Sequence, residues 1–274
     1  MKYKCIALDM DGTLLNSDKK ISEKTRLAIE EAAKMGKIIV LNTGRGVSEL
    51  SDFREILKDV RYANCLSGGL VYDFQEEKAI FSQELPYTLV QELFPYARLE
   101  ECMIHCLSKE SYVEQYAFDH MERYHMDVYK DHFRRLAIKL EDLQKAHKEQ
   151  RFIVHKFNMY HNNQAGRDRS RARLVEKGYP VELVDAETTS LEITQKGIDK
   201  GNGLRKLGEY LGFTMDELIV VGDADNDLAA LKVAGLAVAM GNSNENVRKV
   251  CDVIVADNDH DGVAQAIQEY LLKE

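Results

Sequence analysis

Short apolar runs alternate with amphipathic stretches in the first 80 residues of the chain, which is typical of a parallel sheet with crossover helices. Residues 22–35 predict a helix that begins after an N-cap at Ser22 and ends before Gly36, and residues 47–57 predict a second helix. The predicted strands are residues 3–8, 37–41 and 61–66, followed after a turn at 67–69 by a hairpin of residues 70–74 and 78–82.

The last 80 residues repeat this alternation. The predicted strands are residues 218–221, 236–240 and 252–255. The predicted helices are residues 203–211, 227–233, 244–250 and 262–272. Both ends of the chain therefore predict an α/β fold in which they form the two halves of one doubly wound parallel sheet.

The middle of the chain differs from both ends in composition. Residues 83–185 contain seven of the eight histidines and eight of the thirteen tyrosines, and their 16 Lys and Arg nearly balance 17 Asp and Glu. We therefore predict an α+β cap domain of residues 83–185, inserted into a discontinuous core domain of residues 1–82 and 186–274.

The overall composition of the 274 residues, 45% hydrophobic and 30% charged, is that of a globular protein of about two domains. The formal net charge of −9 comes mostly from the predicted core, which has 21 Lys and Arg against 29 Asp and Glu. An acidic balance argues against a nucleic acid as partner, because its phosphate backbone attracts clustered Lys and Arg. A small phosphorylated substrate is not excluded, since a bound divalent cation reverses the local charge.

Three further features favour a cytoplasmic protein with no membrane partner. No apolar run approaches the roughly 18 residues of a membrane helix. The N-terminus lacks the long apolar stretch and small-residue cleavage site of a signal peptide. The five cysteines lack metal-type CxxC spacing and favour reduced thiols, with pairing of Cys102 and Cys106 across one helical turn as the alternative. The sequence does not indicate the oligomeric state.

The first predicted strand ends in the motif Asp9-Met10-Asp11-Gly12-Thr13. Side chains at i and i+2 of an extended chain point to the same side. Asp9 and Asp11 are therefore expected to face one point beyond the carboxyl end of the strand, where open α/β sheets bind ligands. Two carboxylates so close repel each other, which favours a hard divalent cation or one protonated carboxyl. The alternative is a solvent-exposed Asp-Gly turn.

Two further groups suit a bound anion. The second strand is followed by Asn42-Thr43-Gly44-Arg45, whose hydroxyl, backbone N–H groups and guanidinium can hold an oxyanion. Taken alone, Thr-Gly also fits a plain N-cap and turn. Lys200 precedes a predicted helix, where its ammonium can meet a phosphate or neutralise carboxylates, although a lone Lys is usually a solvated surface charge.

A second acidic motif, GDADND, follows the strand at 218–221. Its three carboxylates and one amide within five residues favour a bound cation. Asp223, Asp225 and Asp227 also match positions 1, 3 and 5 of an EF-hand calcium loop. Position 6 would then be Leu228 instead of Gly and position 12 would be Ala234 instead of Glu, so a calcium loop is not expected here.

A third acidic run, DNDHDG at residues 257–262, matches the calcium loop better. Its position 12 is Gln268 instead of Glu, and a strand instead of a helix precedes it. We therefore expect a turn that N-caps the closing helix, with a second cation site as the alternative.

Acidic, hydroxyl and basic groups thus follow successive strands of one predicted sheet, in the order DxDGT, TGR, K and GDxxND. With these motifs the sequence resembles the haloacid dehalogenase superfamily, and within it the Cof-type phosphatases with a large α/β (type IIB) cap. The resemblance extends over nearly the whole chain, through DMDGTLL, LEITQKGIDKG, GDADND, AMGNSNENVRKVCD and DHDGVAQAI. It implies a magnesium-dependent phosphatase of small phosphorylated metabolites, such as sugar phosphates, FMN or pyridoxal phosphate.

The resemblance also implies a role for each motif residue. Asp9 would be the nucleophile that forms an aspartyl-phosphate, Asp11 the general acid and base, and Lys200 would offset charge in the transition state. The phosphate-binding residues would be Met10, Thr43, Gly44, Lys200 and Asn226. The ligands of Mg²⁺ would be Asp9, the main-chain carbonyl of Asp11, and Asp223. The supporting residues would be Asp227 and Arg45.

Two other functions remain open: phosphoryl transfer to a sugar, as in mutases of the superfamily, and a non-catalytic ligand-binding regulator on the same scaffold. The large cap after the second motif argues against the first, and the complete set of motif residues argues against the second. Substrate choice is expected to reside in the cap. There, Arg167, Arg169, Arg171 and Arg173 are predicted to lie on an exposed helix, and the aromatic residues mostly in the cap core.

Overall fold

The computed structural model describes residues 2–273, which form two compact units. The core unit comprises residues 2–44, 52–82 and 199–273, and the cap unit comprises residues 45–51 and 83–198. The core was predicted to resume at residue 186. Strand β11 (Ser190–Gln195) instead pairs with β9 (Lys156–Tyr160) of the cap sheet, so the chain joins the core unit only from Asp199.

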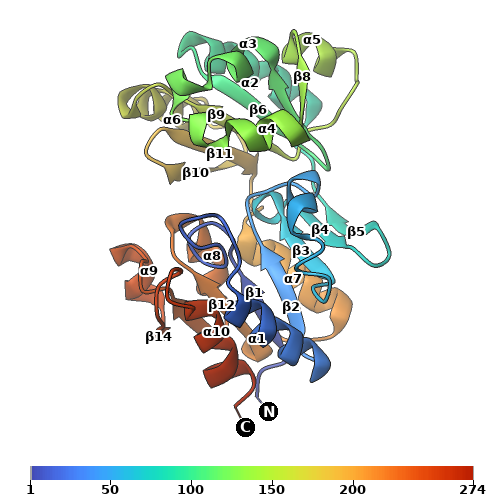
Figure 1. The fold of residues 1–274 in the computed structure, drawn as a ribbon. Coiled ribbons are helices and arrows are strands. Elements are labelled where there is room, and N and C mark those ends of the chain that lie inside the picture. Colours follow the sequence, from blue (N-terminus) through green and yellow to red (C-terminus); the bar gives the residue numbers. More distant parts are fainter. Residues whose placement is uncertain (1, 274) are drawn as a thin grey trace. The chain divides into compact units, whose positions relative to one another are not determined.

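The core unit is built on an eight-stranded sheet with the order β14-β13-β12-β1-β2-β3-β4-β5 (Figure 1). Six strands are parallel, and β4 and β5 add an antiparallel hairpin at one edge. This is the predicted α/β fold with a doubly wound sheet, which is confirmed. The strands are β1 (Cys5–Leu8), β2 (Ile38–Asn42), β3 (Tyr62–Cys65), β4 (Leu70–Asp73), β5 (Lys78–Ser82), β12 (Leu218–Gly222), β13 (Leu236–Ala239) and β14 (Val253–Ile254).

Helices cover both faces of the core sheet (Figure 1). On one face Cys5 and Ala7 of β1 pack with Leu204 and Leu207 of α7. Because side chains alternate along a strand, Ile6 and Leu8 of β1 point to the opposite face, where they are also fully buried. The helices on the first face are α7 (Lys200–Leu211), α8 (Leu228–Leu231) and α9 (Glu245–Val250). Those on the other face are α1 (Glu23–Lys34), α10 (Gly262–Ala266) and the π-helical turn η7 (Ile267–Leu271).

The start of α1 confirms the predicted N-cap. The Ser22 hydroxyl accepts a hydrogen bond from the Thr25 N–H at 3.1 Å. Gly36 follows the helix with φ +75°, a backbone conformation that favours glycine.

The predicted helix at 47–57 is wrong, because only a short 3-10 helix, η1 (Ser48–Phe53), forms there. The Glu49 carboxylate turns back to accept a hydrogen bond from the Gly46 N–H at 2.7 Å. Ser48, Ser51 and the neighbouring Asp also favour caps and turns over helix interiors.

The predicted helix at 227–233 is also shorter than expected. It consists of the 3-10 helix η6 (Asp225–Asp227) and the single turn of α8. The Gly235 N–H then hydrogen-bonds the carbonyl oxygens of Met215 and Leu218, which directs the chain into β13. Two further 3-10 helices of the core unit are η2 (Leu66–Gly68) and η5 (Met215–Glu217).

The cap unit contains a six-stranded sheet with the order β10-β11-β9-β6-β7-β8. All neighbouring strands are antiparallel except β7 and β8. The predicted α+β character of the cap is confirmed. The remaining strands are β6 (Met103–Leu107), β7 (Ser111–Glu114), β8 (Ala137–Leu140) and β10 (Val181–Glu187).

The two faces of the cap sheet differ in their cover. One face packs its apolar side chains, such as Cys106 and Phe157, on three helices: α2 (Tyr87–Leu99), α5 (Leu143–Lys148) and α6 (Gln164–Lys177). On the other face, Met103 and Val113 pack with residues of α3 (Gln115–Asp119), the 3-10 helix η3 (Met121–Tyr124) and α4 (Lys130–Leu136). A further 3-10 helix of this unit is η4 (Asp127–Tyr129).

Two predictions for the cap are settled by these elements. The four arginines lie on α6 as expected, but Arg167 is buried, and Arg169 and Arg173 bind the Glu100 carboxylate. The alternative of a disulfide between cysteines one helical turn apart is wrong, because Cys106 lies in β6 and all five cysteines are free thiols.

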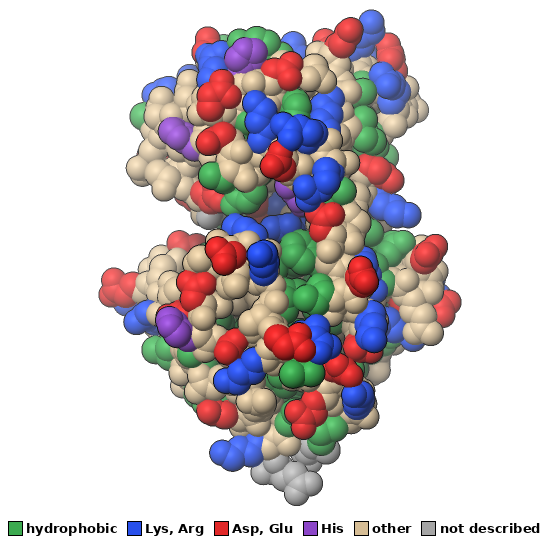
Figure 2. All heavy atoms as spheres, viewed as in Figure 1, with side chains coloured by type: hydrophobic (Ala, Val, Ile, Leu, Met, Phe, Trp, Pro, Cys, Tyr) green, Lys and Arg blue, Asp and Glu red, His purple; other side chains and the backbone are tan. Residues whose placement is uncertain are grey.

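The surface mixes both signs of charge. On the face drawn in Figure 2, acidic and basic side chains are interspersed over each unit. The acidic side chains that outnumber the basic ones, for a net charge of −9, therefore do not gather in one patch on this face. Among residues 2–273, no helix combines the length and the apolar composition that crossing a membrane requires.

Candidate active site

The sequence motifs meet at one edge of the core sheet. Asp9 follows β1, Thr43 follows β2 and Asp223 follows β12, all at the carboxyl ends of parallel strands. The loops after these ends form the crevice where open α/β sheets bind ligands.

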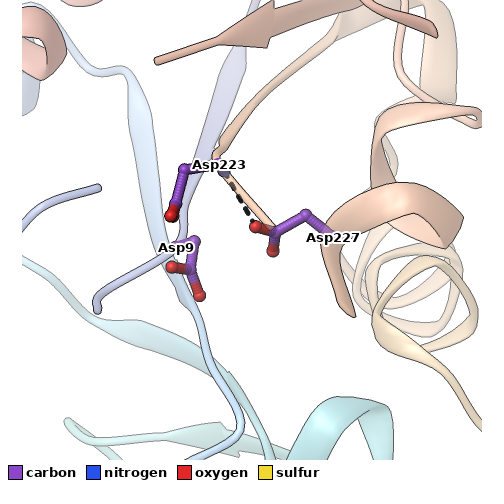
Figure 3. A group of neighbouring side chains, drawn as sticks. All are labelled: Asp9, Asp223 and Asp227. Atoms are coloured by element: carbon purple, nitrogen blue, oxygen red, sulfur yellow. Dashed lines mark hydrogen bonds between the residues drawn. The ribbon is translucent and has the colours of Figure 1, made fainter. Parts of the chain in front are cut away.

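Three carboxylates come together at this edge (Figure 3). One oxygen each of Asp9, Asp223 and Asp227 lies within 4.8 Å of the others. Asp9 is 5% exposed and Asp227 is fully buried. The Asp223 N–H donates to Asp227 Oδ2 at 3.1 Å. This bond fixes the Asp227 carboxylate against the backbone of Asp223. Two of these carboxylates are buried and the third is partly buried, which is costly unless cations or protons compensate their charge.

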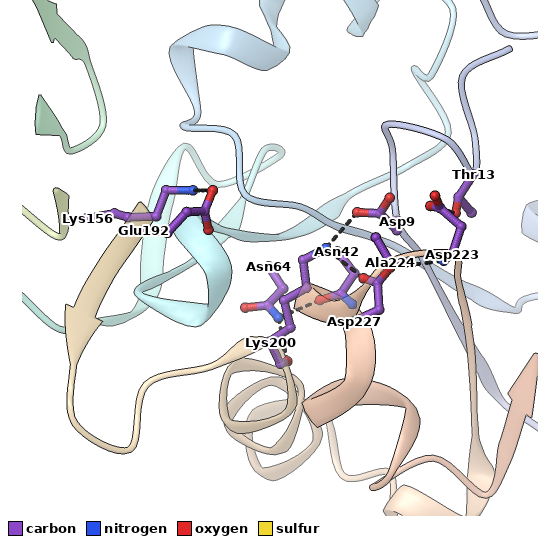
Figure 4. Close-up of polar contacts among 10 residues, drawn as sticks. All are labelled: Asp9, Thr13, Asn42, Asn64, Lys156, Glu192, Lys200, Asp223, Ala224 and Asp227. Atoms are coloured by element: carbon purple, nitrogen blue, oxygen red, sulfur yellow. Dashed lines mark hydrogen bonds and ion pairs between the residues drawn. The ribbon is translucent and has the colours of Figure 1, made fainter. Parts of the chain in front are cut away.

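Lys200 supplies one compensating charge (Figure 4). Its Nζ donates to Asp9 Oδ1 at 2.6 Å and to Asp227 Oδ1 at 2.7 Å, and the side chain is fully buried. Burial alone would lower the pKa of Lys200, but the charges of Asp227 and Asp9 outweigh it and raise this pKa. The ammonium therefore stays protonated. Asp227 thus contacts the lysine that it was predicted to orient.

One cation does not compensate three carboxylates. Burial, together with the charge of Asp227, raises the pKa of Asp9 well above its usual value, although Lys200 opposes this rise. Burial also raises the pKa of Asp223 to about 6. Without a further cation, the site therefore takes up protons at a higher pH than ordinary carboxylates do.

The loop after Asp9 holds Asp223 from the opposite side. The Thr13 hydroxyl donates to Asp223 Oδ1 at 2.8 Å. Gly12 adopts φ +85°, and a Cβ at this position would lie 2.4 Å from Asp223 Oδ2. Glycine is thus required at position 12 both by its backbone conformation and by the close carboxylate.

Met10, Asp11, Thr43 and Gly44 follow the carboxyl ends of β1 and β2 in the chain. Asp11 receives a hydrogen bond from Lys19 Nζ at 3.1 Å, and Met10 is completely buried. The Thr43 main chain is fixed between two neighbours, because its N–H donates to Asn64 O and its carbonyl accepts from Ser67 N. Arg45 belongs to the cap unit, whereas Gly44 before it closes a segment of the core unit.

Asn226 carries a buried polar atom that the protein leaves unpaired. Its Oδ1 has no hydrogen-bond partner in the described part of the chain. A side-chain amide presents both donors and an acceptor, and the orientation of the amide group is assigned from its partners. Asn226 therefore has hydrogen-bonding capacity left for a ligand.

The sequence interpretation missed Asn64, which fixes the backbone of Lys200. Asn64 Nδ2 donates to the Lys200 carbonyl at 2.8 Å and to Asn42 Oδ1 at 2.7 Å (Figure 4). A Cβ on Gly203 would lie 1.9 Å from Asn64 Oδ1, so α7 approaches β3 closely. An asparagine within each of two short buried strands was the available signal, because an apolar strand interior rarely accepts an amide without a partner.

The acidic turn at 257–262 is tied into the fold by hydrogen bonds. Asp259 accepts from the N–H and the hydroxyl of Ser17, and Asp261 accepts from the hydroxyl of Ser22 at 2.5 Å. Asp261 stands at the position before α10, but its side chain makes no capping bond to that helix. The predicted turn before the closing helix is therefore confirmed, with Asp261 at the N-cap position, but its carboxylate is engaged by Ser22 and does not cap the helix.

The donor set at the sheet edge fits a hard divalent cation. Its ligand atoms are carboxylate oxygens, which Mg²⁺ prefers. Asp227 has both oxygens engaged, by Lys200 and by the Asp223 N–H. Asp223 accepts a bond at Oδ1, which leaves its Oδ2 for a metal ion, and the Asp9 carboxylate lies within reach of the same point.

Comparison with known proteins gives matches along nearly the whole chain. The profile of haloacid dehalogenase-like hydrolases matches residues 6–267. The 5-amino-6-(5-phospho-D-ribitylamino)uracil phosphatase YcsE of Bacillus subtilis (strain 168) is 29% identical over 273 residues, covering 98% of this chain and 96% of that protein. The pyridoxal phosphate phosphatase YbhA of Escherichia coli (strain K12) is 26% identical over 280 residues, covering 99% of this chain and 100% of that protein.

A solved structure is similar in both sequence and fold. The haloacid dehalogenase-like hydrolase from Bacteroides thetaiotaomicron is 28% identical, with a TM-score of 0.83. The match covers 98% of this chain and 99% of that chain, so the likeness extends through both units.

The raised pKa of Asp223 predicts a pH-dependent effect of Asp223→Asn on stability without divalent cations. This pKa lies near 6 in the folded protein, above the usual value of 3.8, so the folded state binds a proton on Asp223 more tightly than the unfolded state does. The protonated Asp223 carboxyl therefore contributes to the free energy of unfolding below pH 3.8, and this contribution is lost as the pH rises through 6. Asn stays neutral and keeps an oxygen for Thr13. The difference in free energy of unfolding between the variant and the unsubstituted protein should therefore favour the variant by on the order of 2 kcal/mol more at pH 8 than at pH 4.

Urea denaturation in EDTA at both pH values measures this difference, with Asp225→Asn as the exposed control. A gain for Asp223→Asn that is the same at pH 4 and pH 8 would contradict the assignment.

Proposed function

Because the chain belongs to the haloacid dehalogenase-like hydrolase family, we propose that it dephosphorylates small metabolites through an aspartyl-phosphate on Asp9. Its class, a hydrolase of phosphoric monoesters, rests on this family and on the phosphatases it resembles. The observation that carries the proposed mechanism is the contact of the buried Lys200 ammonium with both Asp9 and Asp227. It leaves the second oxygen of Asp9 available for attack.

The first proposed step transfers the phosphoryl group to the protein. Asp9 Oδ2 attacks phosphorus, an O–P bond forms, and the bond from phosphorus to the ester oxygen breaks. Asp11 gives its proton to the departing oxygen, so that the product leaves as a neutral alcohol. In the second step Asp11 takes a proton from water, which attacks phosphorus and releases Asp9 and inorganic phosphate.

Several polar groups would bind the phosphoryl oxygens during transfer. We assign this role to Lys200, the Thr43 hydroxyl, the Asn226 amide and the backbone N–H groups of Met10 and Gly44. The unpaired buried atom of Asn226 and the main chain of Thr43, which is hydrogen-bonded to Asn64 and Ser67, support this assignment. Arg45 would play a supporting part.

A magnesium ion would be held by the carboxylates of Asp9 and Asp223 and by the main-chain carbonyl of Asp11. When bound, it would supply positive charge that offsets the repulsion between the Asp9 carboxylate and the phosphate dianion. The raised pKa values of Asp9 and Asp223 support this need for a second cation, because Lys200 alone leaves excess negative charge.

The substrate class is proposed from the relatives. One is named for a phosphorylated ribitylamino compound and another for pyridoxal phosphate. We propose substrates of this size: sugar phosphates, FMN or pyridoxal phosphate.

Asp9→Asn should abolish phosphate release, because an amide is a very poor nucleophile, and we expect a loss of at least about 10³-fold in kcat. The measurement is phosphate release from a panel of phosphorylated metabolites with Mg²⁺. Asp18→Asn, an exposed change in the same segment, is the matched control. Unchanged turnover in Asp9→Asn would contradict the assigned nucleophile.

The proposed metal site predicts that more Mg²⁺ is needed at low pH. Asp223 must lose its proton to bind the ion, and its pKa near 6 makes protons compete below that pH. The Mg²⁺ concentration for half-maximal activity should rise by up to about tenfold per pH unit below 6. Titration with Mg²⁺ between pH 5 and pH 8 measures this concentration, and a value independent of pH would count against Asp223 as a ligand.

A further inference from the structure

Three polar residues form one row across the core sheet, at the edge where the candidate site lies. Asn42 pairs with Asn64 across β2 and β3. Leu8 pairs with Leu41 across β1 and β2, so the next positions along these parallel strands, Asp9 and Asn42, are level with each other. Both asparagines are completely buried. We call Asn42 and Asn64 the amide pair.

The face of the sheet that carries this row is covered by α7. Ala7 and Val40 lie in one apolar cluster with Leu204 of α7. Asp9 and Asn42 follow them by two positions, so their side chains share that face. The apolar face of the strands therefore ends in polar residues at the start of the helix.

Lys200, the first residue of α7, is held both by its side chain and by its main chain. Its Nζ donates to Asp9 Oδ1 at 2.6 Å and to Asp227 Oδ1 at 2.7 Å. Its carbonyl accepts from Asn64 Nδ2 at 2.8 Å (Figure 4). Asn64 Nδ2 also donates to Asn42 Oδ1 at 2.7 Å. The carboxylates thus fix the ammonium, and the amide pair fixes the backbone that carries it.

The Lys200 carbonyl determines how both amides are turned. A carbonyl oxygen only accepts, so Asn64 must present its NH₂ group to it. The same NH₂ group donates to Asn42, which must therefore present its oxygen. Neither of the two remaining atoms, Asn42 Nδ2 and Asn64 Oδ1, has a hydrogen-bond partner among residues 2–273.

The amide pair is a costly way to fill the interior of a sheet domain. Buried polar atoms without partners lower the stability of the fold, and apolar residues fill this face elsewhere. Asn64 also restricts α7, because a Cβ on Gly203 would lie 1.9 Å from Asn64 Oδ1. Local features that cost stability are expected at functional sites.

The turn after β3 approaches the same helix start. Leu66 and Ser67 have φ values of +54° and +56°, a strained backbone for residues other than glycine. A Cβ on Gly68 would lie 2.0 Å from the carbonyl oxygen of Asp199, the residue before Lys200. Backbone strain is therefore kept next to the residue that the amide pair fixes.

From these contacts we infer that Asn64, oriented by Asn42, is a positioning residue for the proposed phosphoryl transfer and acts through Lys200. This inference rests on the proposed phosphatase function. An ammonium that is displaced from its place would offset less of the charge of the transition state and would hold Asp9 less firmly. The loss should therefore appear in kcat. KM should change little, because the other proposed phosphate-binding groups belong to different elements.

The experiment replaces Asn64 by leucine, which has a similar size and no donor. We expect kcat for p-nitrophenyl phosphate with Mg²⁺ to fall by roughly tenfold to a hundredfold, and KM to change by less than about threefold. Asn64→Ser, whose side chain is one atom shorter, should also lower kcat by at least about fivefold, and it serves as the test where the leucine variant does not fold.

Asp73→Asn is the matched control. Asp73 is completely buried in β4 of the same sheet, and its carboxylate binds Arg61. Its replacement should lower stability and leave kcat unchanged. Urea denaturation measures the stability of every variant, so that kcat is compared among folded proteins.

Three outcomes would overturn the inference. These are a kcat within about threefold of the unsubstituted protein in each folded Asn64 variant, a fall in kcat that Asp73→Asn reproduces, and a rise in KM at unchanged kcat. In each case the unsubstituted protein still releases phosphate, so the proposed function stands. Absence of phosphate release by the unsubstituted protein would overturn the proposed function, and this inference with it.

Discussion

The candidate site depends on one buried cation, the Lys200 ammonium between Asp9 and Asp227. Without it, two carboxylates of very low exposure would face each other in a medium that screens charge poorly. With it, Asp9 is fixed by one oxygen and Asp227 by both, since the Asp223 N–H holds the second. The orientation of the predicted nucleophile therefore rests on an ion pair as much as on the strand that precedes it.

The fold brings these groups together from distant parts of the chain. Parallel pairing of β1 with β12 sets Asp9 beside Asp223, and the first turn of α7 carries Lys200. Asn64 on β3 then fixes the Lys200 backbone. In the cap unit, pairing of β9 with β11 likewise brings Lys156 to Glu192, 36 positions further along the chain, as a buried ion pair.

The motifs and most elements could be predicted because their signals are local. Asp9 and Asp11 follow an apolar run, and Ser22 precedes an amphipathic stretch. Asn64 could not be assigned, since its partner Lys200 lies 136 positions away and no periodicity links them. The pairing of Lys156 with Glu192 depends on strand register within the cap sheet, which a single sequence does not specify. The helix expected at 47–57 was wrong because side-chain bonds of Glu49 and turn-forming residues prevailed over periodicity.

The central claim, that Lys200 and Asp227 compensate each other's burial, is tested most directly by a double-mutant cycle on the free energy of unfolding. The variants are Lys200→Met, Asp227→Asn and the double substitution, measured by urea denaturation at pH 7. We predict that Lys200→Met alone destabilises by about 3 kcal/mol or more, and that the double variant is more stable than the sum of the single effects by about 1–3 kcal/mol. Effects that add to within about 0.5 kcal/mol would contradict the account.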